Sequence, residues 1–319
     1  MWRWTTRVLV SLCSVLIAAG VAGATYQWIA TRSDLAATPP PGRLVDVGGH
    51  RLHIWCTDAG APSVILETGL GGSSVDWGFV QPEVARFTQV CSYDRAGMGY
   101  SDPGPSPRTT RRIARELATL LDRADISGPV ILVGASIGGL MVRVFASEYA
   151  ERAAGLVLVD ASHENQKEDI PRLAPFVPLL SSVGVLRLLG VSFGLRPASL
   201  APSVREFARA TGFRAAAYQT AADEMSDLGE SAAEVRASRR RLTIPVVVVT
   251  AGRGADPLWR DLQRDQVALS QRGCQIMAEQ SSHVVVIDQP SVVVDAIRAT
   301  VDAARGRNET ALCGSRVGE

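Results

Sequence analysis

The sequence predicts an α/β fold in which a mostly parallel β-sheet is covered by helices on both faces. Short apolar, β-branched runs alternate with helical patterns along most of the chain. The 319 residues are 46% hydrophobic and 20% charged, which is enough material for a large core. The alternation of strand and helix patterns is interrupted only at 162–243, where Ala, Arg and Leu occur at helical spacing and no strand pattern is found. We therefore expect one domain with a helical insertion.

Eight runs are expected to form the strands of this sheet. The first two flank Gly48-Gly49 and are typical of a hairpin, and the later runs are joined by helices through right-handed crossovers. Ligands of such sheets bind beyond the carboxyl ends of the strands. In chain order, the expected strands are 43–47, 51–57, 63–67, 88–93, 129–134, 155–159, 244–251 and 275–279.

Residues 8–31 carry no charge and are mostly apolar, which predicts an N-terminal membrane helix. As a helix this segment is about 36 Å long, enough to span a bilayer. The alternative is a cleaved secretory signal with its site at the small residues 22–24. Apolar residues continue past that site, which favours an uncleaved anchor. Arg3 and Arg7 are expected to stay inside, so both interpretations place the rest of the chain outside the cytoplasm.

These patterns divide the chain into segments. The Thr-Pro-Pro-Pro-Gly run that follows the apolar segment predicts a non-helical linker that holds the domain off the membrane. The expected organisation is a transmembrane anchor or signal peptide at 1–32, a Pro-rich linker at 33–42, an α/β core at 43–161 and 244–307, a helical cap at 162–243 and a C-terminal tail at 308–319.

Charge and composition exclude several classes of function. The net charge is +1 with basic and acidic residues interspersed, so no nucleic-acid surface is indicated. The sequence contains no phosphate-loop motif, no Cys-rich zinc motif and no helical pair of metal ligands, and its four histidines do not cluster. We expect neither a cofactor nor a metal.

Cysteine usage is consistent with an oxidising compartment. Cys13 lies in the apolar segment, and Cys56, Cys91, Cys274 and Cys313 are an even number that could form two disulfides. Buried free thiols are the alternative.

The most informative motif is a G-x-S-x-G at Gly134–Gly138, between a buried strand and a helix. A serine on such a sharp turn needs glycine neighbours, because Cβ atoms there would collide with the adjoining strand and helix. The turn exposes the hydroxyl of Ser136. It also directs the backbone N–H of Ile137 toward the position where a substrate oxyanion would form.

A histidine and two aspartates could complete a catalytic group with this serine. His283 follows the last expected strand, in the chain order serine, acid, histidine, and is the candidate general base. Asp160 and Asp256 both lie just past strand ends, and either could orient the imidazole. The alternatives are a cap-hinge hydrogen bond for Asp160 and a helix cap for Asp256. We favour Asp160, because its strand end is better defined.

Two further stretches make the chain resemble the capped α/β-hydrolases over nearly all of 43–305. Thr68–Trp77 resembles the family's His-Gly-x oxyanion loop, and Asp94–Ser101 resembles its D-x-R-G-x-G-x-S turn. Matched by position, Leu70 supplies a second oxyanion N–H beside Ile137. Thr68 replaces the family's histidine, so the internal hydrogen bonds of the loop must differ.

The resemblance implies a mostly parallel eight-stranded sheet and an acyl-enzyme mechanism without a cofactor. Most of the family keeps its acid where Asp256 stands, and a minority that includes the haloalkane dehalogenases keeps it where Asp160 stands. Dehalogenase and epoxide-hydrolase members carry an aspartate nucleophile, so Ser136 leaves ester or amide hydrolysis.

The cap is expected to select the substrate, a small-molecule or lipid ester. Residues 176–180 and 185–189 are apolar enough to line an acyl pocket or to rest on a bilayer, and an ordinary cap core is the alternative. A proline-iminopeptidase-like amide hydrolase, with Asp223 and Glu224 binding a substrate amine, is a second possibility. A non-catalytic binding protein on the same fold is the third, although it would not need the serine, histidine and acids together.

Overall fold

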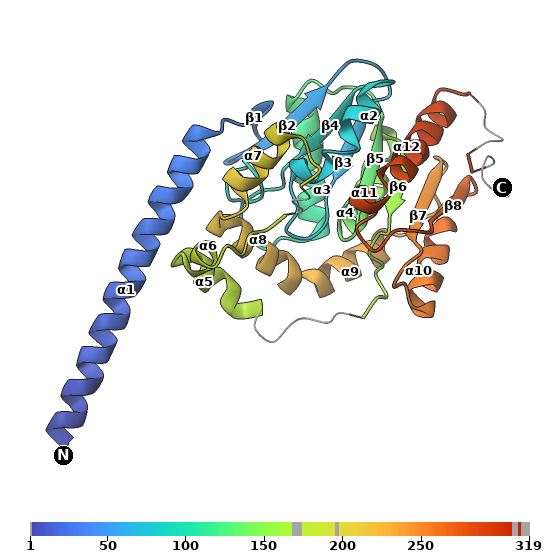
Figure 1. The fold of residues 1–319 in the computed structure, drawn as a ribbon. Helices are drawn as coiled ribbons and strands as arrows, with labels where there is room; N and C mark the ends of the chain where they lie inside the picture. The colour runs from blue at the N-terminus through green and yellow to red at the C-terminus, as the bar shows by residue number, and fades with distance from the viewer. Residues whose placement is uncertain (1, 168–173, 195–197, 308–311, 314–319) are drawn as a thin grey trace.

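A twisted eight-stranded sheet forms the centre of the protein (Figure 1). The computed structural model describes residues 2–167, 174–194, 198–307 and 312–313. The strand order is β1-β2-β4-β3-β5-β6-β7-β8, in which β2 is antiparallel to both of its neighbours, β1 and β4, and all the remaining pairs are parallel. The strands are β1 (Arg43–Asp46), β2 (Arg51–Thr57), β3 (Val64–Glu67), β4 (Val90–Tyr93), β5 (Val130–Ala135), β6 (Ala153–Val159), β7 (Val246–Ala251) and β8 (Gly273–Ala278).

Helices cover both faces of the sheet and bury two separate apolar clusters. In β5, Leu132 packs into one cluster while Ile131 and Val133 pack into the other, so the strand is buried on both sides. The first face carries α3 (Thr110–Arg123), α4 (Gly138–Glu148) and α10 (Pro257–Val267), and the second carries α2 (Gln81–Ala85), α11 (Val285–Asp288) and α12 (Pro290–Ala304). The predicted fold class is confirmed.

The described residues between β6 and β7, in the segment expected to form the cap, contain five helices. Arg143 of α4 makes two hydrogen bonds, at 2.7 and 2.9 Å, to the buried Glu164 carboxylate at the base of this segment. This ion pair ties the segment to the helix that follows Ser136. The helices are α5 (Val177–Ser182), α6 (Val185–Leu188), α7 (Pro202–Thr211), α8 (Ala215–Ser226) and α9 (Leu228–Ser238), and short 3-10 turns occur at Ser74–Trp77, Ala150–Arg152 and Ala174–Phe176.

The N-terminal helix α1 (Trp2–Ala37) is longer than predicted. Among the described residues it is the one helix whose length and composition suit a membrane crossing. It continues through Leu35, Ala36 and Ala37, where the sequence indicated a linker, because these are good helix formers and the first proline comes only at Pro39. Helix α1 also packs against α5 and α7.

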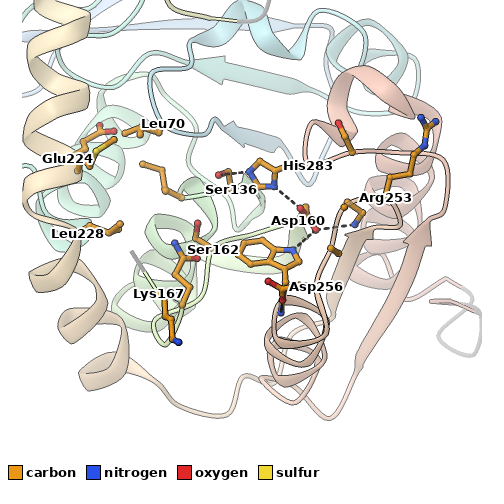
Figure 2. A pocket seen from close by; sticks show the side chains of 18 residues that line it. Leu70, Ser136, Asp160, Ser162, Lys167, Glu224, Leu228, Arg253, Asp256 and His283 are labelled. Atoms are coloured by element: carbon orange, nitrogen blue, oxygen red, sulfur yellow. Dashed lines mark hydrogen bonds and ion pairs between the residues drawn. The ribbon is translucent and has the colours of Figure 1, made fainter. Parts of the chain in front are cut away.

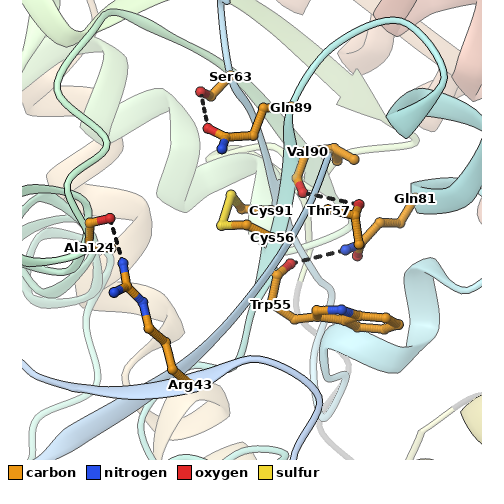
Figure 3. Close-up of a disulfide and its surroundings, with 10 residues drawn as sticks. All are labelled: Arg43, Trp55, Cys56, Thr57, Ser63, Gln81, Gln89, Val90, Cys91 and Ala124. Atoms are coloured by element: carbon orange, nitrogen blue, oxygen red, sulfur yellow. Dashed lines mark hydrogen bonds between the residues drawn. A yellow bond between two sulfur atoms is a disulfide. The ribbon is translucent and has the colours of Figure 1, made fainter. Parts of the chain in front are cut away.

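The four cysteines outside α1 form two disulfides. Cys56 of β2 is bonded to Cys91 of β4, directly opposite it in the antiparallel ladder (Figure 3). Cys274 of β8 is bonded to Cys313, which fixes the chain near its C-terminal end to the edge of the sheet. Apart from Leu312 and Cys313, the predicted tail at 308–319 lies outside the described residues.

Candidate active site

Ser136 occupies the sharp turn between β5 and α4. Its φ of 51° lies in the left-handed region, which non-glycine residues adopt mainly at special sites. The two glycines of the motif make room for this turn: a Cβ on Gly134 would lie 2.6 Å from a methyl group of Val142, and one on Gly138 would lie 2.5 Å from the Thr68 carbonyl oxygen. The strained turn leaves the serine hydroxyl at the carboxyl edge of the sheet, as the sequence predicts.

His283 connects this hydroxyl to Asp160 (Figure 2). Its Nε2 lies 3.0 Å from Ser136 Oγ, and its Nδ1 lies 2.6 Å from Asp160 Oδ2. The Asp160 side chain is 2% exposed, whereas the His283 side chain is 51% exposed and faces the pocket. With Nδ1 protonated, Nε2 is the acceptor for the serine hydroxyl proton.

The second oxygen of Asp160 is also occupied. Oδ1 accepts hydrogen bonds from the Ala251 amide and from the Trp259 indole N–H, both at 3.0 Å. Like Ser136, Asp160 has a positive φ, of 40°, and its amide donates to the Val249 carbonyl of β7 at 2.7 Å. The carboxylate is therefore fixed from both sides and can only present Oδ2 to the imidazole.

The other candidate acid lies in a different setting. Asp256 is the N-cap of α10, where its carboxylate accepts a hydrogen bond from the Trp259 amide at 2.7 Å. This is the helix-cap role that the sequence offered as the alternative. The geometry brings Asp160, and not Asp256, to His283.

The two expected oxyanion donors lie on either side of Ser136. Leu70 and Ile137 both line the pocket, and Ile137 immediately precedes α4. Within the described part of the chain, neither backbone N–H is used in a hydrogen bond to the protein. Both amides are therefore available to a bound oxygen.

A buried arginine fixes the loop that carries Leu70. The Arg95 guanidinium donates to the carbonyl oxygens of Thr68 at 2.8 Å and of Gly69 at 2.9 Å, directly before Leu70. It also donates to Glu67 of β3 at 2.5 Å, and through two nitrogens to Glu224 of α8 at 2.7 and 2.9 Å. Arg95 thus joins the oxyanion loop, the sheet and the cap helix α8 in one buried cluster.

The charges in this cluster compensate one another. Burial raises the pKa of Glu67, although the Arg95 charge and a hydrogen bond from the Tyr93 hydroxyl act in the opposite direction. Burial alone would lower the pKa of Arg95, but its two carboxylate partners outweigh that effect and raise it. Arg95 therefore stays charged at any pH that the fold survives.

A carboxylate also closes the loop. The Thr68 hydroxyl donates to Asp76 Oδ2 at 3.4 Å, and the same oxygen accepts from the Ser73 amide at 3.1 Å. Asp76 thus joins the start of the loop to the turn at Ser73.

The neighbouring Asp94–Ser101 turn is structural, as predicted. Asp94 accepts from the Ser74 amide at 2.6 Å, from the Tyr100 amide at 2.9 Å and from His53 Nδ1 at 2.8 Å. Burial would raise the pKa of Asp94, but the His53 charge and these donors lower it below its usual value. Through the contact with the Ser74 amide, the turn supports the loop that carries Leu70, and none of its residues lines the pocket.

Two connected hollows meet at Ser136 and His283. The larger, of about 610 Å³, is lined on one side by Glu224, Met225 and Leu228 of the cap. The smaller, of about 370 Å³, has a wall of apolar side chains that consists of Leu70, Trp77, Ala135, Val159, Val284, Val285 and Val286. The pocket can hold a substrate with an apolar part on one side of the serine and a more polar part on the other.

The cap acids proposed to bind an amine are not free. Glu224 is 3% exposed and paired with Arg95. Asp223 points elsewhere, accepting from Gln219 at 2.8 Å and from Ser106 at 3.4 Å. The charge of Glu224 is thus taken by Arg95, and Asp223 is not among the residues that line the pocket.

Comparison with known proteins shows the family of this chain. A model of the alpha/beta hydrolase family matches residues 64–296, which is most of the chain. The chain belongs to the alpha/beta hydrolase family.

Two curated relatives of this hydrolase match over shorter stretches. An uncharacterized protein of Schizosaccharomyces pombe is 37% identical over 119 residues, 36% of this chain and 22% of that protein. A putative carbamate hydrolase, RutD, of Pseudomonas savastanoi is 36% identical over 113 residues, 35% of this chain and 43% of that protein. The hydrolase thus spans about a fifth of the first relative and less than half of the second.

A solved structure covers far more of the hydrolase. The thermophilic esterase from Thermogutta terrifontis superposes with a TM-score of 0.62 over 83% of this chain and 99% of that chain. The sequence identity is 20%, so the likeness shows the shared fold alone.

Sequence reasoning missed three contributors to the site. Trp259 and the Ala251 amide fix Asp160, and Arg95 fixes the oxyanion loop. A signal for Trp259 was present in the sequence. This residue stands three residues after Asp256, in the first turn of the helix that Asp256 caps, and this helix begins just past the end of a strand. For the contact between Arg95 and Glu224, which are 129 residues apart, the sequence carried no local signal.

Proposed function

We propose that this hydrolase cleaves carboxylic esters through an acyl-enzyme on Ser136. The observation that carries the proposal is the continuous hydrogen-bonded path from Ser136 Oγ through His283 to Asp160, at 3.0 and 2.6 Å. A hydroxyl, an imidazole and a buried carboxylate in this order are the components of serine acyl transfer. The match to the alpha/beta hydrolase family supports hydrolysis as the reaction class.

The first half of the reaction makes the acyl-enzyme. His283 Nε2 takes the Ser136 proton while Oγ attacks the ester carbonyl carbon, and the carbonyl oxygen becomes an oxyanion. Asp160 stabilises the imidazolium that forms. As the tetrahedral intermediate collapses, the proton on Nε2 passes to the leaving alkoxide and the alcohol departs.

The second half returns the enzyme to its starting state. A water gives its proton to His283 Nε2 and attacks the acyl carbon, and the proton then passes to Ser136 Oγ as the acid leaves. The oxyanion is stabilised in both halves by the amides of Leu70 and Ile137. Loss of one such donor costs about 3 kcal/mol of transition-state stabilisation.

We also propose that α1 anchors the enzyme in a membrane with the catalytic domain outside the cytoplasm. The apolar part of α1, preceded by Arg3 and Arg7, supports both the crossing and its direction. The two disulfides support an oxidising compartment.

A chain-length series of p-nitrophenyl esters tests the proposed reaction. We expect steady hydrolysis by the full chain and a loss of about 10⁵-fold or more in kcat for Ser136→Ala, because the residual rate then rests on binding and the oxyanion donors alone. Equal rates for the two proteins, or no hydrolysis of any chain length by the folded parent, would refute the assignment.

A further inference from the structure

Helix α1 has two halves with different surroundings. From Trp2 to Ala19 the side chains are all exposed, whereas from Gly20 onward one side of the helix is at least partly covered by the cap. Figure 1 shows the first half extending away from the domain and the second half lying beside α5, α6 and α7. The helix is thus a free span followed by a docked segment.

Polar contacts fix the docked segment to the cap. Gln27, on an otherwise apolar stretch, is 4% exposed and donates to the Phe213 carbonyl at 2.5 Å. Arg187 of α6 donates to Gln27 at 3.0 Å, to Thr31 at 3.1 Å and to Asp34 at 2.5 Å. We call Arg187 with these three partners on α1 the clasp. Because it uses successive turns of α1, it fixes the direction of the free span relative to the cap.

The position of the bilayer surface follows from the helix itself. Trp2 and Trp4 mark one end of the apolar part of α1, and Tyr26 and Trp28, in the docked segment, mark the other; all four are well exposed. Tryptophan and tyrosine concentrate at the two membrane interfaces, and the distance from Trp4 to Tyr26 is about 33 Å along a helix, close to the thickness of a bilayer core. The interface therefore lies at Tyr26–Trp28, level with the clasp.

The cap presents an apolar surface at this same level. Gly184, between α5 and α6, lies against Tyr26, and a Cβ added there would be 3.2 Å from the Tyr26 ring. We define the apolar face as the exposed residues flanking this turn: Phe176 (57%), Leu179 (61%), Leu180 (38%), Leu188 (72%), Leu189 (70%) and Val191 (51%).

Most of the exposed large apolar side chains outside α1 belong to the apolar face. Among the described residues, three others are exposed: Leu70, Leu258 and Met277, far from one another in the sequence. Exposed apolar side chains gathered on one part of a protein mark a contact surface. Because the apolar face lies beside α1, the helix proposed to enter the bilayer, we infer that the bilayer is what it contacts.

We propose that the apolar face lies in the outer part of the same bilayer leaflet from which α1 emerges, with the clasp setting its depth. This inference rests on the membrane anchoring proposed above and adds a second point of contact. Apolar side chains that reach the boundary between headgroups and acyl chains lie about 5 to 10 Å deep.

The apolar face is close in sequence to one wall of the pocket. Phe193, two residues after Val191, donates its amide to the Gly212 carbonyl at 2.9 Å, and Gly194 lines the smaller, apolar hollow beside Ser136. A lipid ester leaving the bilayer at α6 would reach this hollow over a short stretch of chain. The substrate class that fits is an ester dissolved in the membrane.

Depth-dependent quenching tests the proposal in the full chain. With Cys13→Ser as background, a single environment-sensitive fluorophore is placed at Leu189→Cys, and the protein is reconstituted in phosphatidylcholine vesicles that contain lipid brominated at carbons 6 and 7. The matched site is Ala150→Cys, exposed just before β6 and therefore at the opposite end of that strand from Asp160. We expect quenching at least about threefold stronger at 189 than at 150, as for a side chain inside the headgroup region.

The clasp is tested with Arg187→Met in the same reconstitution. We expect the protein to stay in the vesicles through α1 while quenching at 189 falls toward the level at 150, because the cap is no longer held at a fixed depth. The melting temperature of the detergent-solubilised protein checks that the variant folds.

The outcomes separate the inference from the proposed reaction. Equal quenching at 189 and 150 overturns the inference, even if the same preparation hydrolyses p-nitrophenyl butyrate. Strong quenching at 189 in a preparation without hydrolysis supports the inference and contradicts the proposed reaction. Self-quenching at 189 that rises with protein density would assign the apolar face to a second copy of this chain and overturn the proposal.

Discussion

The two sides of Ser136 are held in different ways. On the acid side, one buried carboxylate orients a histidine whose side chain is 51% exposed. On the oxyanion side, the Leu70 loop is fixed by Arg95, which is fully buried between Glu67 and Glu224. The proposed roles of the two sides explain this difference. A histidine that passes a proton between two oxygens needs only a fixed ring orientation, whereas backbone amides that stabilise a developing negative charge must be held in position before the reaction.

The largest expected effect is on the acid side. Asp160→Asn should lower kcat by about 10⁴-fold, because the amide favours the wrong tautomer of His283 and cannot stabilise its cation. Steady-state kinetics on a short p-nitrophenyl ester measure this. A loss below tenfold would show that the acid side does not work as described.

A smaller effect is expected on the oxyanion side. Glu224→Gln keeps the size of the side chain but removes the negative charge that pairs with Arg95. The loop held by Arg95 should then be less well fixed, which should lower kcat by about tenfold with little change in KM. Asp223→Asn on the same helix is the matched control and should leave both constants unchanged. If Glu224→Gln instead raised KM alone, Glu224 would act in substrate binding and not through the loop.

The support of Asp160 can be tested separately. Trp259→Phe removes the indole donor to Oδ1 and leaves the donor from the Ala251 amide. We expect a loss of about 1 kcal/mol, near fivefold in kcat, as for a typical hydrogen bond. An effect as large as that of Asp160→Asn would mean that the indole, and not the carboxylate, positions the imidazole.

The smallest effect is expected at the other aspartate. Asp256→Asn should change kcat by less than about twofold, and Asp256→Ala should lower the free energy of unfolding by about 1 kcal/mol through loss of the α10 cap. Urea unfolding and kinetics on the same samples measure both. A large loss of kcat in Asp256→Asn would reverse the assignment of the two acids.

Much of the fold and part of the site could be predicted because their signals are local. The turn at Ser136 and the buried strand before it are encoded in adjacent residues, and the place of His283 follows from the strand that precedes it. The strand and helix alternation similarly predicted the sheet, which the family comparison confirms.

The remaining features depend on contacts between distant segments. Asp160 and Asp256 both follow strand ends, and only the position of the Trp259 indole and the Ala251 amide shows which carboxylate faces the histidine. The sequence indicated Arg95 only as part of a turn, because its partner Glu224 comes from the distant cap segment. The docking of α1 was missed for the same reason, since Gln27 meets Arg187 only in the folded chain.

The most direct test of the central claim is labelling with a fluorophosphonate, followed by mass spectrometry of the tryptic peptides. A hydroxyl activated by His283 should give one stoichiometric adduct on the peptide that contains Ser136, and the adduct should be absent from Ser136→Ala and strongly slowed in Asp160→Asn. A folded parent protein that takes up no label, or that carries it on another residue, would contradict the account.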